Sequence, residues 1–191
     1  MLGGVVLKNL DTIFNTMIKT ILVSIFTLLI ASTSFAQDRT PDERGFLVKV
    51  GDMAPDFTMK LTNRKTVKLS ELKGKTVMLQ FTASWCGVCR KEMPHIEKRI
   101  WKAYNKRGLL VYAVDKDEPK SMAKMLKKQT GISYPIGLDP DSNIFGLYAG
   151  MREGVTRNIL IDKTGKIIFL TRLFNEDEFN RLVERIEKEF N

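Results

Sequence analysis

The sequence of 191 residues predicts an α/β fold with a central mixed sheet and helices on both faces. Two observations lead to this prediction. Short apolar runs rich in strand-forming residues alternate with longer segments whose apolar residues recur at helical spacing. The expected order is β-α-β-α-β, followed by a β-hairpin and a final helix. Because parallel strands joined by crossover helices are buried on both sides, helices must cover both faces of the sheet.

The strands are predicted from apolar runs that end at turn residues. Core strands are expected over residues 76–81, 109–114, 133–139, 158–162 and 166–173, the last two joined as a hairpin through the turn sequence KTG. Nearer the N-terminus of the domain, residues 56–61 and 65–69 indicate a second hairpin.

The helices follow from apolar periodicity and from the residues that begin and end helices. Helices are expected over residues 90–108, 118–131 and about 176–190, with a short helix or turn over 141–150. In the last helix, Asn175 and Glu178 have the spacing of a helix cap and its reciprocal partner.

Residues 1–36 are expected to be a secretory signal peptide. Lys19 supplies positive charge before the apolar run 21–30, which has the length of a signal-peptide core and is too short to span a membrane. The small residues that end at Ala36 suit cleavage before Gln37. The protein is therefore expected to be periplasmic or secreted after cleavage.

Two alternatives remain open for this segment. Met17 is a second candidate for the start of the chain, and the apolar residues Val5, Val6 and Leu7 would help an uncleaved segment to act as a membrane anchor. No cysteine directly follows the apolar run, which excludes lipid attachment by the lipoprotein route.

The rest of the chain has the length of one domain. Residues 48–191 are expected to form it, preceded by a flexible polar leader over residues 37–47. The net charge is +9, but basic and acidic residues alternate, and no basic run carries interleaved aromatic residues. This pattern argues against a nucleic-acid partner. We expect a monomer.

The only two cysteines, Cys86 and Cys89, lie in the sequence WCGVC. They close too small a loop to be an effective structural staple. The pair lies where a strand turns into a helix, so the helix dipole and free backbone N–H groups would stabilise a thiolate at Cys86. Cys89, in the first turn, is close enough to resolve a mixed disulfide. Arg90 and Lys91 either favour that thiolate or are ordinary solubilising charges.

Several motifs, in order, resemble the secreted TlpA/ResA-like thiol:disulfide oxidoreductases of the thioredoxin superfamily. The motifs are WCGVC after VMLQFTAS, Pro94 five residues past Cys89, VGDMAPDF at 50–57, extra residues at 117–150 and the sequence NILIDKTGKII. The resemblance covers roughly residues 48–190. It implies a thioredoxin-like fold with an N-terminal β-hairpin extension and an AhpC/TSA-type insertion of a helix and a strand.

The resemblance also implies roles for individual residues. Cys86 would be the exposed nucleophile and Cys89 the buried resolving thiol, with no cofactor beyond their redox-active disulfide and no metal. Gln80 stands where thioredoxins place a proton-transferring aspartate, and it cannot ionise. Glu92 is the candidate for that proton transfer; the alternative is a first-turn glutamate that simply favours the helix dipole.

The sequence departs from the family pattern at one loop. In GVTRN, at residues 154–158, Thr156 stands where the family has a cis-proline. A cis bond before threonine costs ~2.5–4 kcal/mol, so we expect either a trans bond or a loop held by strong contacts. Val155 should present backbone groups to a substrate, and Arg157 should add positive charge near the site. The expected substrate-binding residues are Trp85, Gly87, Val88, Val155, Thr156 and Arg157.

The sequence argues against two rival functions. A thiol peroxidase needs a cysteine motif that begins with a proline, and no such proline precedes Cys86. A metal carrier needs more soft ligands, since the only histidine, His95, lies on a different helix face from Cys89 and is expected to be a packing residue.

The preferred function is therefore a thiol:disulfide oxidoreductase that reduces disulfides of envelope proteins. Its partners would be those disulfide-containing proteins and a membrane electron donor. The alternative is a metal-carrying or peptide-binding module on the same fold.

Overall fold

The computed structural model describes residues 18–19 and 40–191. Residues Thr40–Asn191 form one compact unit. The signal peptide, its cleavage site and the start at Met17 lie outside the described residues, apart from Ile18 and Lys19. Within the described ranges, no helix is both long and apolar enough to cross a membrane.

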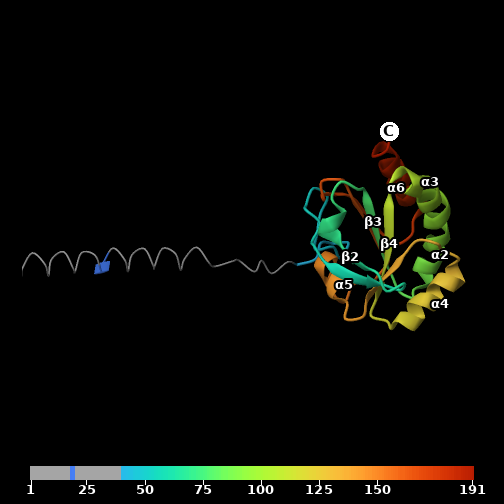
Figure 1. Ribbon diagram of the computed structural model, residues 1–191, viewed down its shortest axis with the longest axis horizontal. Coiled ribbons are helices and arrows are strands. Elements are labelled where there is room, and N and C mark those ends of the chain that lie inside the picture. Colours follow the sequence, from blue (N-terminus) through green and yellow to red (C-terminus); the bar gives the residue numbers. More distant parts are fainter. Residues whose placement is uncertain (1–17, 20–39) are drawn as a thin grey trace, which may run out of the picture. The chain divides into compact units, whose positions relative to one another are not determined.

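A seven-stranded mixed sheet forms the centre of this unit (Figure 1). The strands are β1 (Thr58–Leu61), β2 (Thr66–Lys68), β3 (Val77–Thr82), β4 (Leu110–Lys116), β5 (Ile136–Asp139), β6 (Arg157–Ile161) and β7 (Ile167–Arg172). Their order across the sheet is β2-β1-β5-β4-β3-β6-β7. The neighbours β3, β4 and β5 run parallel, and the other neighbours pair antiparallel. The prediction of a mixed α/β sheet is confirmed.

Helices cover both faces of the sheet. They are α2 (Gly87–Ile96), α3 (Lys102–Tyr104), α4 (Lys120–Thr130), α5 (Asn143–Tyr148) and α6 (Glu176–Lys188). The apolar side chains of α2, α4 and α6 share one core with one face of the sheet, and those of α5 and the short turn Leu69–Leu72 share a second core with the other face. Figure 1 shows the same division, with α5 across the sheet from α2 and α4.

Strand β3 contributes side chains to both cores. Leu79 and Phe81 lie in the core beneath α5, whereas Met78 lies in the core beneath α2. Because side chains alternate along a strand, Gln80 shares the face of Met78. The strand is central, between β4 and β6, so its carboxyl end brings the cysteines to the middle of one sheet edge.

The helix after the cysteines is continuous but changes its pitch. Pro94 lies inside it, and a π-helical turn over Glu97–Trp101 follows before α3 begins. Proline lacks the N–H that an α-helix needs, and wide turns are a common way to absorb such an interruption. The apolar residues Met93, Ile96 and Ile100 of this segment are all fully buried.

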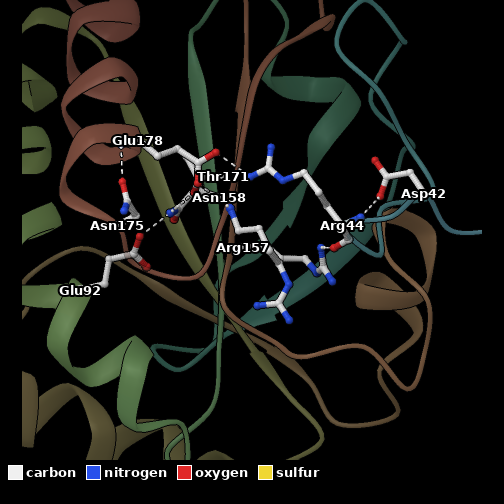
Figure 2. Close-up of polar contacts among 9 residues, drawn as sticks. Asp42, Arg44, Glu92, Arg157, Asn158, Thr171, Asn175 and Glu178 are labelled. Atoms are coloured by element: carbon white, nitrogen blue, oxygen red, sulfur yellow. Dashed lines mark hydrogen bonds and ion pairs between the residues drawn. The ribbon is translucent and has the colours of Figure 1, made fainter.

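The predicted flexible leader is wrong for residues 40–47. The carboxylate of Asp42 accepts backbone N–H bonds from Arg44 and Phe46, and Phe46 pairs with Ala149 as an isolated bridge. Arg44 also forms an ion pair with Glu178 of α6, 2.6 Å apart (Figure 2). The polar composition of this segment predicted a flexible chain, but Phe46 is 2% exposed and anchors the segment to the core.

The cap of α6 is only half as predicted. The side chain of Asn175 accepts the backbone N–H of Glu178 at 3.0 Å, as expected for an N-cap. The carboxylate of Glu178 does not return to Asn175. It binds Arg44 and the backbone N–H of Arg172 instead, because the docked leader offers it a charged partner.

Candidate active site at the start of helix α2

The cysteine pair sits between the end of β3 and the first turn of α2. Cys86 is the N-cap residue, with extended backbone angles, and its sulfur accepts the backbone N–H of Cys89 at 3.1 Å. The two cysteines are joined as a disulfide with Cα atoms 5.3 Å apart. A sulfur at this position receives the free N–H groups of the helix start, which favour a thiolate after reduction.

The two cysteines differ in burial, and Cys86 is less exposed than predicted. Cys86 is 7% exposed and Cys89 is fully buried. Trp85 precedes Cys86, and Val88 lies between the two cysteines; they are 61% and 37% exposed, and Gly87 is also exposed. A Cβ added to Gly87 would meet nothing within 4 Å, so the surface beside Cys86 is open.

Thr156 brings its hydroxyl against both sulfurs. Its Oγ1 lies 3.2 Å from Cys86 Sγ and 3.3 Å from Cys89 Sγ. The described residues contain no cis peptide bond, so the bond before Thr156 is trans, one of the two expected outcomes. The loop is held in place, since the Thr156 carbonyl accepts the backbone N–H of Leu173 and Val155 is buried.

The prediction that Arg157 binds substrate is wrong. Its side chain is fully buried, and its guanidinium lies over the ring of Phe46. The guanidinium also donates to the carbonyl of Arg44 at 2.8 Å (Figure 2). Burial, together with the charge of Arg172, lowers the pKa of Arg157 to about 10. The side chain is a tie between the leader and β6, so it cannot touch an incoming substrate.

Glu92 lies in a buried polar network on the α2 side of the sheet. One carboxylate oxygen accepts from Asn158 Nδ2 at 2.6 Å and the other from Gln80 Nε2 at 3.2 Å (Figure 2 draws Asn158). The Gln80 carbonyl in turn accepts the hydroxyl of Tyr134 at 2.7 Å. Burial raises the pKa of Glu92 to about 7, although the bonds from Asn158 and Gln80 act to lower it. Glu92 is thus an enclosed titratable group and not a surface residue.

A second acidic group holds the turn before the cysteines. The carboxylate of Glu118 accepts both the backbone N–H and the hydroxyl of Ser84, each at 2.5 Å. From the other side, the guanidinium of Arg90 donates to the Ser84 carbonyl. Arg90 therefore fixes the backbone of the turn, which neither reading of its charge predicted.

A model of the AhpC/TSA family matches residues 50–170. The chain belongs to the AhpC/TSA family. Thiol-disulfide oxidoreductase ResA of Bacillus cereus is 33% identical to this AhpC/TSA-family protein over 121 residues, which are 63% of this chain and 68% of the relative. ResA of Geobacillus thermodenitrificans is 30% identical over 141 residues, 73% of this chain and 79% of the relative.

Solved structures extend the similarity to the fold. The solution structure of a protein disulfide isomerase candidate from Bacteroides thetaiotaomicron is 54% identical, with a TM-score of 0.74 over 76% of this chain and 92% of the other. The thioredoxin domain of a thiol-disulfide oxidoreductase from Bacteroides vulgatus is 26% identical, with a TM-score of 0.64 over 75% of this chain and 99% of the other. The predictions of a thioredoxin-like fold and of a ResA-like thiol:disulfide oxidoreductase are confirmed.

The lone histidine of this AhpC/TSA-family protein packs against aromatic residues. The ring centroid of His95 lies 4.9 Å from that of Phe174 and 6.1 Å from that of Phe179. Among the residues that the structure describes, no three His, Cys, Asp or Glu side chains gather as metal ligands.

Sequence reasoning missed Glu118, Asn158 and Tyr134. A signal existed for Glu118, because it follows β4, whose carboxyl end lies beside that of its parallel neighbour β3. Asn158 was visible as a polar residue within an otherwise apolar strand. Nothing in the local pattern around Tyr134 indicated that its hydroxyl reaches Gln80.

Proposed function

We propose that this protein reduces disulfide bonds of exported proteins by dithiol–disulfide exchange at Cys86 and Cys89. The observation that carries the proposal is the unequal burial of the pair. Cys86 keeps 7% of its surface exposed next to exposed Trp85, whereas Cys89 is fully buried. Attack by an accessible thiolate, followed by internal resolution, requires this arrangement.

The reaction consists of two exchanges. The Cys86 thiolate attacks one sulfur of the substrate disulfide, and the other substrate sulfur leaves with the electron pair and takes up a proton. Cys89 then loses its proton and attacks Cys86 Sγ, which breaks the mixed disulfide and releases the second substrate thiol. The substrate gains two electrons and two protons, and the Cys86–Cys89 disulfide forms.

Glu92 accepts the proton of Cys89 in this scheme. It lies on α2, three residues beyond Cys89, and its carboxyl group is buried. With a pKa of about 7 it exchanges protons at neutral pH. Gln80 and Asn158 hold the carboxylate by donating to it.

The substrate-binding surface consists of the residues around the accessible sulfur. Trp85, Gly87 and Val88 offer exposed apolar and backbone surface on one side. The Thr156 hydroxyl contacts both sulfurs, and the backbone groups of Val155 and Thr156 are the proposed contacts for a substrate peptide. Peptide segments that carry the target disulfide would lie across this surface.

The partners follow from the export signal expected in residues 1–36, with cleavage near Ala36–Gln37 or retention as an anchor. Substrates are then disulfide-containing proteins of the cell envelope. The oxidised pair must be reduced again by a dithiol donor in the membrane, because an oxidising compartment holds no reducing pool. The protein works as a monomer, without nucleic acid and without a cofactor beyond its own disulfide.

A redox titration tests the proposal. The protein is equilibrated in glutathione or dithiothreitol buffers and its free thiols are counted by alkylation and mass. We expect one two-electron couple that is absent in Cys86→Ser and Cys89→Ser, at a potential nearer to about −270 mV than to about −120 mV. Failure to form an intramolecular couple in any buffer would refute disulfide exchange, and a potential near about −120 mV would refute the reducing direction.

A further inference from the structure

We propose that the Thr156 hydroxyl is a catalytic group that serves the two sulfurs in turn, donating a hydrogen bond first to the Cys86 thiolate and then to the Cys89 thiolate. The inference deepens the proposed function and rests on it, since it assigns a group to each of the two exchanges.

The geometry places one hydroxyl between two reacting atoms. Thr156 Oγ1 lies 3.2 Å from Cys86 Sγ and 3.3 Å from Cys89 Sγ. Among the described residues, it is the only side chain hydrogen-bonded to either sulfur; the other bond, to Cys86 Sγ, comes from the Cys89 backbone N–H. Thr156 is 3% exposed, so little water competes for these contacts.

A hydroxyl at this place favours the reduced state of the pair. It carries one O–H donor, while the sulfurs of a disulfide are only weak acceptors. A thiolate is a charged acceptor, and hydrogen bonds to charged groups are roughly twice as strong as neutral ones. The same Thr156 hydroxyl therefore stabilises the reduced Cys86 thiolate more than the Cys86–Cys89 disulfide.

The hydroxyl can change its partner without moving the backbone. The loop is tied to β7 through the Thr156 carbonyl and Leu173, and β6 begins at the next residue, Arg157, which pairs with Phe81 of β3. Because both sulfurs already lie within 3.3 Å, rotation of the O–H bond alone redirects the hydrogen. A proline at this position has no side-chain donor, so it could not act in this way.

The switch follows the charge through the reaction. When Cys86 bonds to the substrate sulfur, it loses its negative charge and becomes a weaker hydrogen-bond acceptor. Cys89 then gives its proton to Glu92 and becomes the anion, and Thr156 donates to it. Attack of Cys89 on Cys86 Sγ forms the internal disulfide, and the substrate thiolate leaves with the electron pair and takes a proton from solvent.

Thr156→Val tests this inference because it removes the hydroxyl and keeps the shape. We expect the pH midpoint of Cys86 alkylation in the reduced protein to rise by about one unit. The equilibrium with glutathione should shift about tenfold towards the disulfide, which is about 30 mV for a two-electron couple. The first-order decay of a Cys86–glutathione mixed disulfide, followed by mass, should slow about tenfold.

Two further variants complete the design. Thr156→Ser keeps a hydroxyl and should restore all three quantities to within about twofold of the wild type. Thr76→Val is the matched control, since Thr76 is equally buried, and within the described residues its hydroxyl has no hydrogen-bond partner. It should change none of them. If Thr156→Val folds poorly, Thr156→Ala makes the same comparison with a smaller side chain.

The possible outcomes separate this inference from the proposed function. If the wild type forms the couple, but the pH midpoint, the glutathione equilibrium and the decay rate are unchanged in both Thr156→Val and Thr156→Ala, the role of the hydroxyl is overturned. Disulfide exchange itself then still stands. A change in the equilibrium without slower decay of the mixed disulfide would overturn the second donation. If the wild type forms no couple at all, the proposed function fails first and the inference falls with it.

Discussion

Burial determines the protonation state of Glu92, the candidate proton carrier at this site. Glu92 is 1% exposed, and burial raises its pKa to about 7 even though two side-chain amides donate to it. Both forms of the carboxyl are therefore populated at neutral pH. A group in this state can accept a proton in one exchange and release it before the next.

Glu92→Gln is expected to slow the resolution of mixed disulfides at least tenfold at pH 7, because an amide cannot accept the proton of Cys89. The rate of disulfide reduction against pH should also lose the step near pH 7 that the carboxyl contributes. Stopped-flow rates with a peptide disulfide, measured from pH 5 to 9, check both effects. Glu187→Gln, at an exposed position of α6, is the control. A step that persists in Glu92→Gln would assign it to another group.

The sequence predicted these residues to different degrees. Cys86 and Cys89 follow from spacing and from the strand-to-helix turn, both of which are local. Glu92 was found as a candidate, but whether it lies inside depends on the distant Asn158. Arg157 was misplaced, because its side-chain direction is set by packing against Phe46, far away in the sequence.

At the level of elements, apolar periodicity predicted the strands and helices because burial of one face is what fixes them. Apolar periodicity did not predict the docking of residues 40–47, because a single buried aromatic side chain anchors this otherwise polar segment. Phe46 packs against the α5 side of the sheet and beneath the guanidinium of Arg157, 4.4 Å from its ring centroid. Residues 40–47 are thus part of the domain, and they contact the strand that carries the Thr156 loop.

Phe46→Ala is expected to lower the free energy of unfolding by ~3–5 kcal/mol, the usual cost of removing a buried phenylalanine side chain. The loss of the contact with Arg157 adds to this cost, since it leaves a buried guanidinium without its aromatic partner. Urea unfolding at pH 7 measures the effect. Val50→Ala, four residues on and 58% exposed, should change the value by less than about 0.5 kcal/mol. Equal effects of the two substitutions would show that the leader does not dock.

Buried carboxyls determine how the stability of the whole molecule depends on pH. Burial raises the pKa of Glu92 to about 7, and burial together with the negative charge of Glu118 raises that of Asp115 to about 8. In the unfolded chain the same groups titrate near about 4. The folded protein therefore holds more protons than the unfolded chain between these values. The stability that these two groups contribute is fully present below about pH 4 and is lost as the pH rises towards 8.

Asp115→Asn separates this effect from all others, because it keeps the shape of a fully buried side chain and removes its titration. The free energy of unfolding of the wild type should fall by ~2 kcal/mol or more between pH 5 and pH 8, and that of the variant by less. The difference between the two proteins should therefore grow in favour of the variant as the pH rises. Urea unfolding of the oxidised proteins at four pH values measures it without titrating the cysteines, with Asp141→Asn as the exposed control. Parallel curves for wild type and Asp115→Asn would mean that Asp115 titrates as it does in water. A widening gap would mean that the edge of β3 and β4, where Glu118 holds the cysteine turn, carries its buried acid protonated at neutral pH.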